Sequence, residues 1–387
     1  MTRLFNIEKH HAGIVSKATM FKVLKYLDRE EVRTPVLLLD RDKVREKAEA
    51  IGSRVRNSRV FYAVKANPDL ETLRLMNSLG LGFEIASAGE LRMLGLIGVE
   101  PGRIISSNPV KPRHFLEEAS AYGVRYFAFD SAEEVDKMAA AAPGASVYIR
   151  LSVPNEGSEW PLSRKFGAEM DQAMGLIMRA AEKGLDVCGI TFHVGSQCLN
   201  MFNWDTAIYK ARALWETAEK EGVGMRILNI GGGYPIKYTK NVVSVENIDK
   251  NVDRLIRENF SPEVEVFIEP GRAMVGDAGV FVASVIGKAR RVDEQWLYID
   301  VGVFNGLMES LGGIRYSYLV EISGGRGPTV SYTVAGPSCD SFDVLDRDVP
   351  LPEPEVGSLV LIPSSGAYTV SYASEFNGFS IPKTILI

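Results

Sequence analysis

The chain has 387 residues, of which 46% are apolar and 24% charged, a length and composition that suit roughly two or three globular domains. Its formal net charge of -5 excludes the strongly basic surface that nucleic-acid binding requires. Three cysteines are too few for a disulfide framework, and the first residues lack an apolar signal core, which favours a cytoplasmic protein. Apolar runs such as residues 36–39 end at charges within a few positions, so no membrane span is expected.

Eight short runs rich in Val, Ile, Phe and Tyr lie between residues 60 and 272, where they alternate with amphipathic helical patterns. They are VFYAVKA, LGFEIAS, RIISSN, YFAFD, SVYIRL, CGITFHVG, ILNIGGG and VFIEPGR. Several of the helical patterns end at glycine, the residue expected just after a helix. Because a closed parallel barrel needs eight strands that alternate with helices, the sequence predicts an α/β fold with a (β/α)8 TIM-type barrel over residues 33–272.

The pattern changes after Arg272, where strand-like runs follow one another closely without long helical patterns between them. The runs are VFVASVIGKARRV, QWLYIDVG, PTVSYTVAG, SLVLIPSSGAYTV and KTILI. They predict a second, mostly antiparallel β domain over residues 273–387, with part of residues 1–32 packing on it. The early run TPVLLLD is a ninth strand that the barrel does not need, and we place it at the domain junction or in the β domain.

Polar residues recur at the ends of the predicted barrel strands, where barrels of this type carry their catalytic groups. Lys65 ends the first run among apolar residues, and burial there lowers the pKa of an amine and makes it reactive toward an aldehyde. The structural alternative is a lysine that reaches solvent. The other strand ends carry Glu84, Glu90, Arg150, His193 and Ser196. Any one of these has an ordinary structural explanation, but their joint placement predicts a site.

Two consecutive strands end in features of a phosphate site. Gly231, Gly232 and Gly233 close the seventh run, and Arg272 closes the eighth in EPGR. Glycines let backbone N–H groups approach phosphate, and arginine adds a charged clamp. Together with Lys65, Glu269 and His193, this set suits pyridoxal 5'-phosphate. Four histidines without a CxxC or HExxH pattern offer no ligand spacing, so no metal site is predicted.

A series of motifs makes the chain similar to the fold-type III pyridoxal phosphate decarboxylases, which have an alanine racemase-like barrel, and most of all to bacterial ornithine decarboxylases. In family order they are YAVKANP, EIAS, SEWPLSRKFG, FHVGSQ, GGGYP, EPGR, AGPSCDSFDVL, GAYT and EFNGF. The resemblance runs from residue 33 to the C-terminus. It is specific for fold and cofactor but less so for substrate, because lysine, diaminopimelate, arginine and carboxynorspermidine decarboxylases share much of the set.

The resemblance assigns the cofactor-binding roles residue by residue. It implies that Lys65 binds the cofactor aldehyde, that His193 stacks on the ring and that Glu269 pairs with the ring nitrogen. Arg150 is implied to lie near the ring hydroxyl. The residues implied to bind the phosphate are Ser196, Gly231, Gly232, Gly233, Arg272 and Tyr368.

The resemblance also assigns residues of the β domain to the reaction. Cys339 matches the residue that protonates the substrate α-carbon after carbon dioxide leaves, and Asp340 matches the acid that binds the distal amine. In the family both reach into the neighbouring subunit's barrel, which implies a homodimer with shared sites. Lys165 and Asp343 match an ion pair between subunits, and Phe376 matches an aromatic residue of the same interface. Without the resemblance, Cys339 is better explained as a buried structural cysteine.

The resemblance is incomplete at one position. Many ornithine decarboxylases carry a second acid for the distal amine, and its position falls at or beside Gly312, with Glu309 upstream as a substitute. Asp340 alone would hold the amine through water or accept a longer substrate. We therefore expect decarboxylation of L-ornithine to putrescine in polyamine biosynthesis, with L-lysine to cadaverine as a further reaction.

Other functions stay open at this point. One is a decarboxylase of another amino acid such as diaminopimelate or carboxynorspermidine, although a second amino-acid head would need a cationic clamp where Asp340 is negative. Another is a racemase, which needs a base on each face of the substrate, and Cys339 is a weak candidate for one of them. The last is a non-catalytic relative that binds the cofactor, against which the retention of Lys65, Glu269, Cys339 and Asp340 argues.

Overall fold

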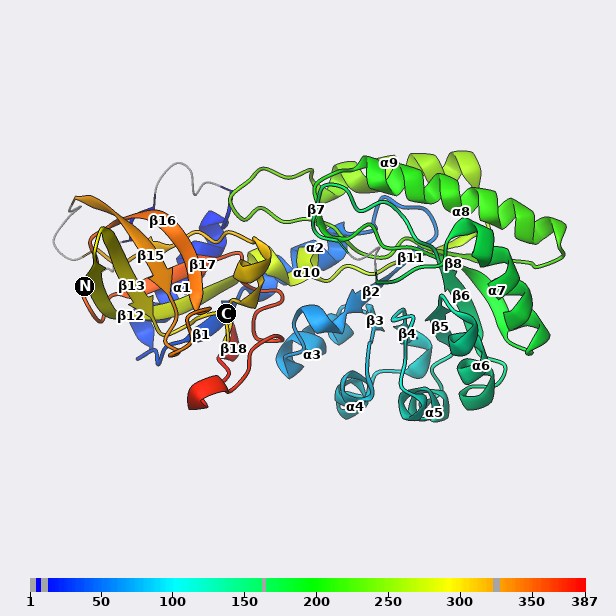
Figure 1. Cartoon of the computed structure of the whole chain (residues 1–387), viewed down its shortest axis with the longest axis horizontal. Helices are drawn as coiled ribbons and strands as arrows, with labels where there is room; N and C mark the ends of the chain where they lie inside the picture. The colour runs from blue at the N-terminus through cyan, green and yellow to red at the C-terminus, as the bar shows by residue number, and fades with distance from the viewer. Residues whose placement is uncertain (1–4, 8–12, 162–164, 323–327) are drawn as a thin grey trace. The chain divides into compact units, whose positions relative to one another are not determined.

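The computed structural model describes residues 5–7, 13–161, 165–322 and 328–387 (Figure 1). The chain divides into two compact units. The barrel unit comprises Ala48–Pro235 and Val243–Gly271, and the β unit comprises Met1–Lys47, Ile236–Val242 and Arg272–Ile387. Residues 162–164 of the SEWPLSRKFG motif and residues 323–327 of the C-terminal loop lie outside the described residues.

Eight parallel strands close into the predicted barrel. In chain order they are β2 (Ser58–Ala63), β3 (Gly82–Glu84), β4 (Ile104–Ser106), β5 (Tyr126–Phe129), β6 (Ser146–Arg150), β8 (Asp186–Thr191), β10 (Ile227–Asn229) and β11 (Glu265–Ile268). The ring closes where β11 pairs with β2. Each strand coincides with one of the eight apolar runs, so the sequence-based prediction of the barrel is confirmed.

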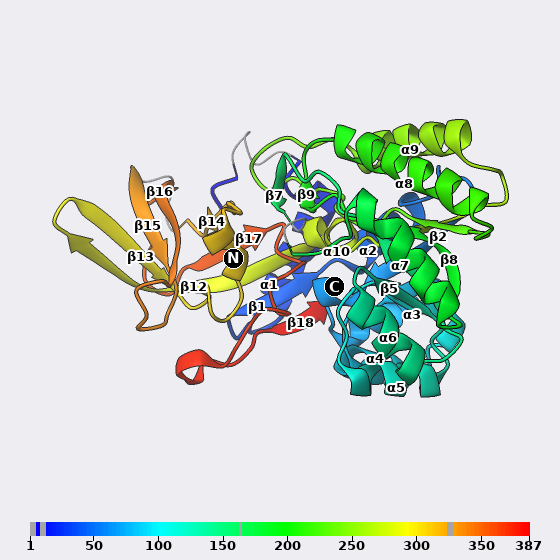
Figure 2. The ribbon, with the colours of Figure 1, turned by 45° about the vertical axis from the view of Figure 1, so that its right-hand side comes forward.

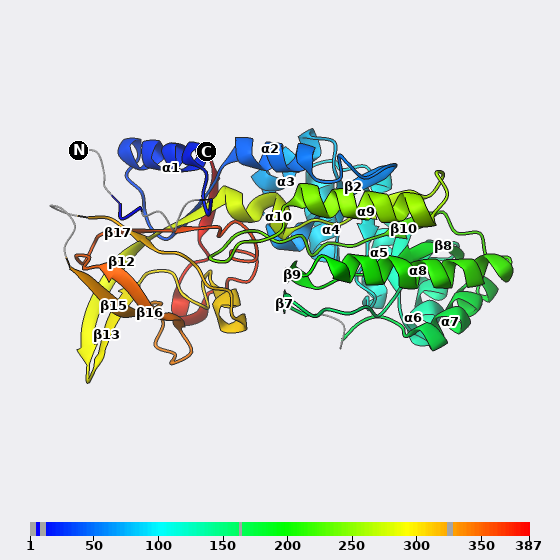
Figure 3. The same cartoon turned by 90° about the horizontal axis from the view of Figure 1, so that it is seen from above.

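Helices cover the outside of the barrel. They are α3 (Leu70–Ser78), α4 (Ala88–Leu96), α5 (Arg113–Tyr122), α6 (Ala132–Ala141), α7 (Met170–Glu182), α8 (Phe202–Lys220) and α9 (Val245–Asn259), of which α8 and α9 lie side by side (Figure 3). Their starts follow from local chemistry, since the Ser87 and Ser131 side chains accept backbone N–H bonds at the beginnings of α4 and α6. The interior of the barrel is filled by side chains such as Phe61, Tyr148 and Phe267, which makes it a packed core.

The β unit is built on an eight-stranded sheet. Its strands are β1 (Val36–Leu39), β12 (Gly279–Arg291), β13 (Glu294–Ile299), β14 (Leu319–Val320), β15 (Thr329–Ala335), β16 (Val344–Pro352), β17 (Leu359–Pro363) and β18 (Lys383–Leu386). Five of the seven strand pairs are antiparallel, while β13 with β15 and β1 with β18 are parallel. The long β12 pairs with β1 and β17 in its first half and then forms a hairpin with β13 (Figure 2).

The ninth predicted strand, TPVLLLD, is β1, and it belongs to the sheet of the β unit. The structure therefore differs from the predicted barrel range of 33–272 at its N-terminal side, because β1 pairs with β12 and β18. Helix α2 (Arg41–Ala50) then carries the chain into the barrel unit, and α10 (Arg272–Val275) carries it back.

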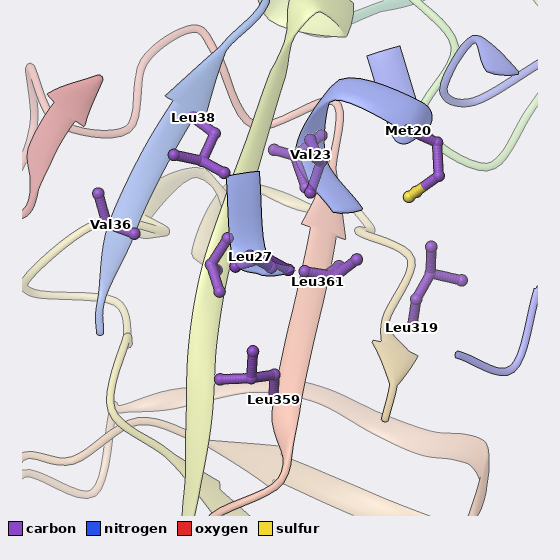
Figure 4. Close-up of a cluster of buried hydrophobic side chains, with 10 residues drawn as sticks. Met20, Val23, Leu27, Val36, Leu38, Leu319, Leu359 and Leu361 are labelled. Atoms are coloured by element: carbon purple, nitrogen blue, oxygen red, sulfur yellow. The ribbon is translucent and has the colours of Figure 1, made fainter. Parts of the chain in front are cut away.

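Helix α1 (Lys17–Arg29) packs on the sheet of the β unit. Its buried face contributes Met20, Val23 and Leu27, which meet alternate residues of the strands beneath (Figure 4). Those strand residues are Val36, Leu38, Val280, Val282, Leu319, Leu359 and Leu361. Alternation follows from the two-residue period of a strand, which turns every second side chain to the same face. Part of the N-terminal segment is thus core of the β unit.

Some short elements have no counterpart in the sequence analysis. Strands β7 (Ser158–Trp160) and β9 (Ser196–Cys198) form a separate antiparallel pair, and short 3-10 helices occur at η2 (Val64–Ala66), η3 (Pro101–Arg103), η4 (Gly276–Ala278), η5 (Met308–Gly312) and η6 (Phe376–Gly378). Across the described ranges, none of the helices has the length and apolarity needed to span a bilayer. Within the same ranges, His, Cys, Asp and Glu side chains form no group of three or more that could hold a metal ion.

Candidate active site

Lys65 lies in η2, directly after the first barrel strand, and its side chain is 46% exposed. Its Nζ atom pairs at 2.5 Å with Oε2 of Glu84, which ends the next strand and is buried. The lysine is therefore accessible and held by a carboxylate, and it is not the deeply buried amine expected from its apolar neighbours. The ion pair fixes the direction of the amine at the mouth of the barrel.

Glu269 is buried just after the last barrel strand, and its carboxylate is held asymmetrically. Oε1 accepts a hydrogen bond from Asn229 Nδ2 at 2.5 Å and another from Ser107 Oγ. Ser107 Oγ lies 2.8 Å from the hydroxyl of Tyr148. Burial first, and then the nearby charge of Glu84, raise the pKa of Glu269 to about 7, while the two donors and the charge of Lys65 act in the opposite direction.

His193 and the glycine motif lie against each other. A Cβ atom built on Gly231 or Gly232 would come within 3.4 Å of the His193 ring. The N–H of Gly195 donates to His193 Nδ1 at 3.0 Å, so the neutral ring carries its hydrogen on Nε2. Burial first, then the charges of Arg150 and Lys65, hold the pKa of His193 well below its usual range. The ring is consequently uncharged at neutral pH.

The glycines at 231–233 are required by close backbone contacts. Gly231 and Gly233 have φ values of 64° and 97°, which L side chains rarely adopt. A Cβ on Gly232 would come within 2.5 Å of the Glu269 carbonyl oxygen, and one on Gly233 within 2.5 Å of that of Gly195, the residue before Ser196. The motif therefore packs closely against the segments that follow strands β8 and β11.

Two further charged groups lie at this mouth. The guanidinium of Arg150 lies 5.0 Å from the ring centre of Phe166, and burial lowers the pKa of Arg150 despite the opposing charges of Glu269, Asp130 and Glu84. The N–H of Ala86 donates to the carboxylate of Glu90 at 2.6 Å. Burial first, and then the charge of Glu84, raise the pKa of Glu90 to about 7. The mouth thus holds both carboxylates and cations.

In the β unit, Arg272 forms a buried bidentate ion pair with Glu309. The two pairs of atoms are Nη1 with Oε2 and Nη2 with Oε1, each 2.7 Å apart, and both side chains are only 3% exposed. Arg272 Nη1 also donates to the hydroxyl of Tyr238, and the guanidinium lies 4.7 Å from the ring centre of Tyr368. Both oxygens of Glu309, predicted as a substrate-binding acid, are therefore engaged by Arg272.

The motifs CDSFD and EFNGF meet in the β unit. Cys339 is exposed, and its N–H and Sγ lie 3.1 and 3.3 Å from Oδ1 of Asn377. Phe376, the neighbour of Asn377, packs its ring 4.6 Å from that of Phe304. Asp340 accepts a hydrogen bond from the N–H of Phe342 at 2.8 Å. Cys339 is thus accessible, which removes the alternative of a buried structural cysteine.

Asp343 is buried within the β unit. Its carboxylate accepts the N–H groups of Val303 at 2.7 Å and Ser338 at 2.9 Å, and it packs against Gly302. These bonds fix the segment that carries Cys339 and Asp340. Lys165, the predicted partner of Asp343 between subunits, is exposed in the barrel unit, with its Nζ 5.0 Å from the ring centre of Phe166.

The structure thus gathers the predicted residues into two groups. Lys65, Arg150, His193, Ser196, Gly231, Gly232, Gly233 and Glu269 belong to the barrel unit, whereas Arg272, Glu309, Cys339, Asp340, Asp343, Tyr368 and Phe376 belong to the β unit. The sequence analysis missed Ser107, Tyr148 and Asn229, the hydrogen-bonded group behind Glu269. The only signal for Ser107 and Asn229 was their position at the ends of predicted strands.

Comparison with known proteins identifies the family of the chain. Residues 41–276 match the family described as pyridoxal-dependent decarboxylase, pyridoxal-binding domain. The chain is 40% identical over 365 residues to the lysine/ornithine decarboxylase of Selenomonas ruminantium, a match that covers 92% of this chain and 90% of that protein. The chain belongs to the pyridoxal-dependent decarboxylase family.

Solved structures of pyridoxal-dependent decarboxylases share the fold. The lysine/ornithine decarboxylase of Vibrio vulnificus, solved in complex with cadaverine, superposes with a TM-score of 0.87 at 30% identity, over 96% of this chain and 99% of that one. The arginine decarboxylase of Paramecium bursaria Chlorella virus superposes with a TM-score of 0.88 at 27% identity, over 95% and 100% of the two chains. Relatives with different substrates thus share this fold.

The donor set fits the cofactor of a pyridoxal-dependent decarboxylase. Lys65 presents an accessible amine, and His193 presents an uncharged ring. The Oε2 atom of Glu269 has no hydrogen bond from the described parts of the chain, which leaves it for a ring nitrogen. The positive φ values of Gly231 and Gly233 turn the backbone sharply beside His193, as an anion-binding turn requires.

Proposed function

We propose that the protein decarboxylates L-ornithine to putrescine and, as a further reaction, L-lysine to cadaverine. One observation carries the proposal. The accessible Lys65 amine and the buried Glu269 carboxylate lie at the same barrel mouth, and Lys65 is close enough to affect the pKa of Glu269. The similarity to lysine/ornithine decarboxylases supports the choice of substrates. A cytoplasmic location is part of the proposal, supported by three cysteines that are all free thiols.

The residues of the barrel unit hold the cofactor in this proposal. Pyridoxal phosphate, when bound, supplies a ring that accepts the electrons left when carbon dioxide departs. Lys65 holds its aldehyde, with Glu84 directing the amine. Glu269 balances a proton on the ring nitrogen, and the uncharged ring of His193 packs on the ring without repelling that positive charge. Arg150 lies near the ring hydroxyl.

The phosphate is bound by backbone and side-chain donors. The proposed ligands are Ser196, Gly231, Gly232, Gly233, Arg272 and Tyr368. Arg272 keeps a neutralising partner in Glu309, so its guanidinium stays oriented in a buried environment. Glu309 is accordingly proposed to orient Arg272, and this replaces its predicted role at the distal amine.

Residues of the β unit act on the substrate. Cys339 is proposed to deliver a proton to the α-carbon after carbon dioxide has left, and its exposed thiol is accessible for that step. Asp340 is proposed to bind the distal amine, and Phe376 to line the same pocket. In a homodimer, Cys339 and Asp340 of one subunit serve the barrel of the other. The proposed contact between Lys165 and Asp343 across subunits competes with the backbone bonds that Asp343 already accepts.

The test is carbon dioxide release by the cofactor-loaded protein with L-ornithine, L-lysine, L-arginine, meso-diaminopimelate and carboxynorspermidine, with the amine products identified by mass. Turnover of ornithine and lysine is expected. Turnover of diaminopimelate or carboxynorspermidine alone would contradict the choice of substrate. Absence of carbon dioxide from every substrate, with cofactor bound, would instead mark a non-catalytic relative, or a racemase if the substrate enantiomer changes.

A further inference from the structure

The two oxygens of Glu269 have different surroundings. Oε1 takes both hydrogen bonds, from Ser107 Oγ and from Asn229 Nδ2, whereas no bond to Oε2 comes from the described residues. Both donors are buried and uncharged. A carboxylate that rotates freely would share its donors between its oxygens, so this arrangement selects one orientation of the group.

Each donor is in turn held by a second group. A serine hydroxyl has one hydrogen, and Ser107 gives it to Glu269, so the Tyr148 hydroxyl 2.8 Å away is the donor to Ser107 Oγ. Asn229 accepts the N–H of Gly231 at 2.9 Å through Oδ1, which leaves its Nδ2 to donate to Glu269 and, at 3.3 Å, to Ser107 Oγ. The hydrogen bonds therefore run in one direction, from Tyr148 through Ser107 to Glu269.

A buried lysine fixes the segment that carries Ser107. The Nζ atom of Lys111, whose side chain is fully buried, donates to the carbonyl of Asn108 at 2.9 Å and to that of Ala128 at 2.6 Å. It also pairs with Glu134 at 2.9 Å. Two carbonyl oxygens and one carboxylate therefore hold the ammonium group. The backbone beside Ser107 is consequently tied to the neighbouring strand β5.

We propose that Ser107 and Asn229 are positioning residues that keep the negative charge on Glu269 and leave Oε2 as the oxygen that meets the cofactor ring nitrogen. The inference rests on the proposed role of Glu269. Without the two donors, the carboxylate would be more basic and would draw the shared proton away from the ring nitrogen. A ring that loses this proton accepts electrons less well, so decarboxylation would slow.

Charged groups also act on Glu269. Lys65 and Arg150 are the cations that face Glu269, while Glu84 opposes its charge, and Tyr148 and His193 are the other titratable groups nearby. One of these cations, Lys65, is already paired with Glu84. The neutral donors are the groups that contact Glu269 directly, and their hydrogen bonds add to the effect of these cations in stabilising its charge.

The first experiment titrates Glu269 in the cofactor-free protein by infrared spectroscopy, using the protonated carboxyl band that Glu269→Gln removes. Ser107→Ala should raise the pH midpoint of this band by about one unit, since a hydrogen bond to a charged group and one pKa unit have similar free energies. Ser106→Ala is the matched control, because Ser106 is also buried and its Oγ has no partner within the described ranges. Ser107→Thr should restore the original midpoint.

The second experiment measures the ring nitrogen itself by 15N NMR with labelled cofactor bound. The nitrogen should be protonated in the parent protein and in Ser106→Ala, and shifted toward the unprotonated form in Ser107→Ala. The kcat of Ser107→Ala should fall about tenfold with KM nearly unchanged, the pattern of a group needed only for the chemical step.

Failure of the inference and failure of the proposed role of Glu269 are distinguishable. An unchanged infrared midpoint in Ser107→Ala overturns the inference alone. If Glu269→Gln leaves the ring nitrogen and the decarboxylation rate unchanged, the proposed role of Glu269 is wrong whatever Ser107 does. Tyr148→Phe removes the hydrogen that Ser107 accepts, and it should move the midpoint in the same direction as Ser107→Ala by a smaller amount.

Discussion

The two units carry their candidate residues in different ways. In the barrel unit they follow regular strands, and hydrogen bonds or ion pairs join them, as for Lys65 with Glu84. In the β unit they lie in irregular segments, where Tyr368 and Asn377 have φ values of 54° and 53°, a conformation with a cost for non-glycine residues. The candidate residues of the barrel unit thus form a connected set, whereas Cys339, Asp340 and Phe376 of the β unit lie in segments that are held mainly by bonds to other residues. Substitutions in the two units should therefore impair different properties of the protein.

The largest effect is expected for Lys65→Ala. Removing the amine should abolish the visible absorption band of the bound cofactor and lower decarboxylation by orders of magnitude, because the aldehyde loses its attachment. Absorption spectra and carbon dioxide release measure both. An unaltered band in this variant would show that another amine holds the cofactor.

Cys339→Ala should distinguish the proposed role of the β unit from cofactor binding by the barrel unit. Cofactor band and dimer should remain, while product formation falls by orders of magnitude or gives wrongly protonated products. Mixing this variant with Lys65→Ala subunits should restore part of the activity through hybrid dimers with one intact site. Near-normal turnover by Cys339→Ala, or no rescue after confirmed subunit exchange, would count against the shared site.

Glu309→Gln tests the buried ion pair of the β unit. The guanidinium of Arg272 loses its charged partner in a buried environment, so the free energy of unfolding of the cofactor-free protein should fall by about 3 kcal/mol. Urea denaturation measures the loss. The control is Glu353→Gln, which breaks an ion pair with Lys288 in the same unit but at the surface, and which should cost less than about 1 kcal/mol. Equal losses in the two variants would contradict a special role for Glu309.

Glu269 should also make the stability of the barrel unit depend on pH. Burial raises the pKa of Glu269 from 4.5 to about 7. Between these two pH values, the Glu269 carboxyl is protonated in the folded state and ionised in the unfolded state. The charged carboxylate therefore destabilises the cofactor-free protein fully above about pH 7 and not at all below about pH 4.5. Glu269→Gln should be more stable than the parent by up to about 3 kcal/mol at high pH, and the difference should vanish as pH falls.

Denaturation at several pH values measures that difference. Glu265→Gln, at the other end of the same strand and 43% exposed, serves as the control and should change stability by less than about 0.5 kcal/mol throughout. A constant difference for Glu269→Gln across the pH range would contradict the assigned burial effect.

The barrel could be predicted from sequence because each strand is a compact apolar run and its order along the chain is its order around the ring. The sequence analysis did not predict strand β16, which has alternating charges and two prolines, Pro350 and Pro352. This segment is a strand because it pairs with β15, and its composition gives no sign of that pairing. Strand β14 is two residues long, too short for any pattern. Long-range pairing accounts for both.

The candidate site also has a part that the sequence predicts and a part that depends on long-range contacts. Lys65 and Glu269 could be predicted from their places at strand ends, because barrel geometry brings those ends together. The acceptor of Ser107 and the partner of Glu309 could not, since each pair joins residues far apart in sequence whose meeting depends on tertiary contacts. The sequence therefore predicts which residues gather at the mouth and leaves open which of them bond.

The pairing of β1 with β18 bears on how the chain folds during synthesis. All barrel strands have been made once residue 268 has emerged, whereas the sheet of the β unit lacks a strand until residues 383–386 follow. The barrel can therefore close while β1 and the apolar face of α1 still wait for β12, β17 and β18. That interval leaves Leu38 and Leu27 exposed in the nascent chain, a surface of the kind that chaperones bind.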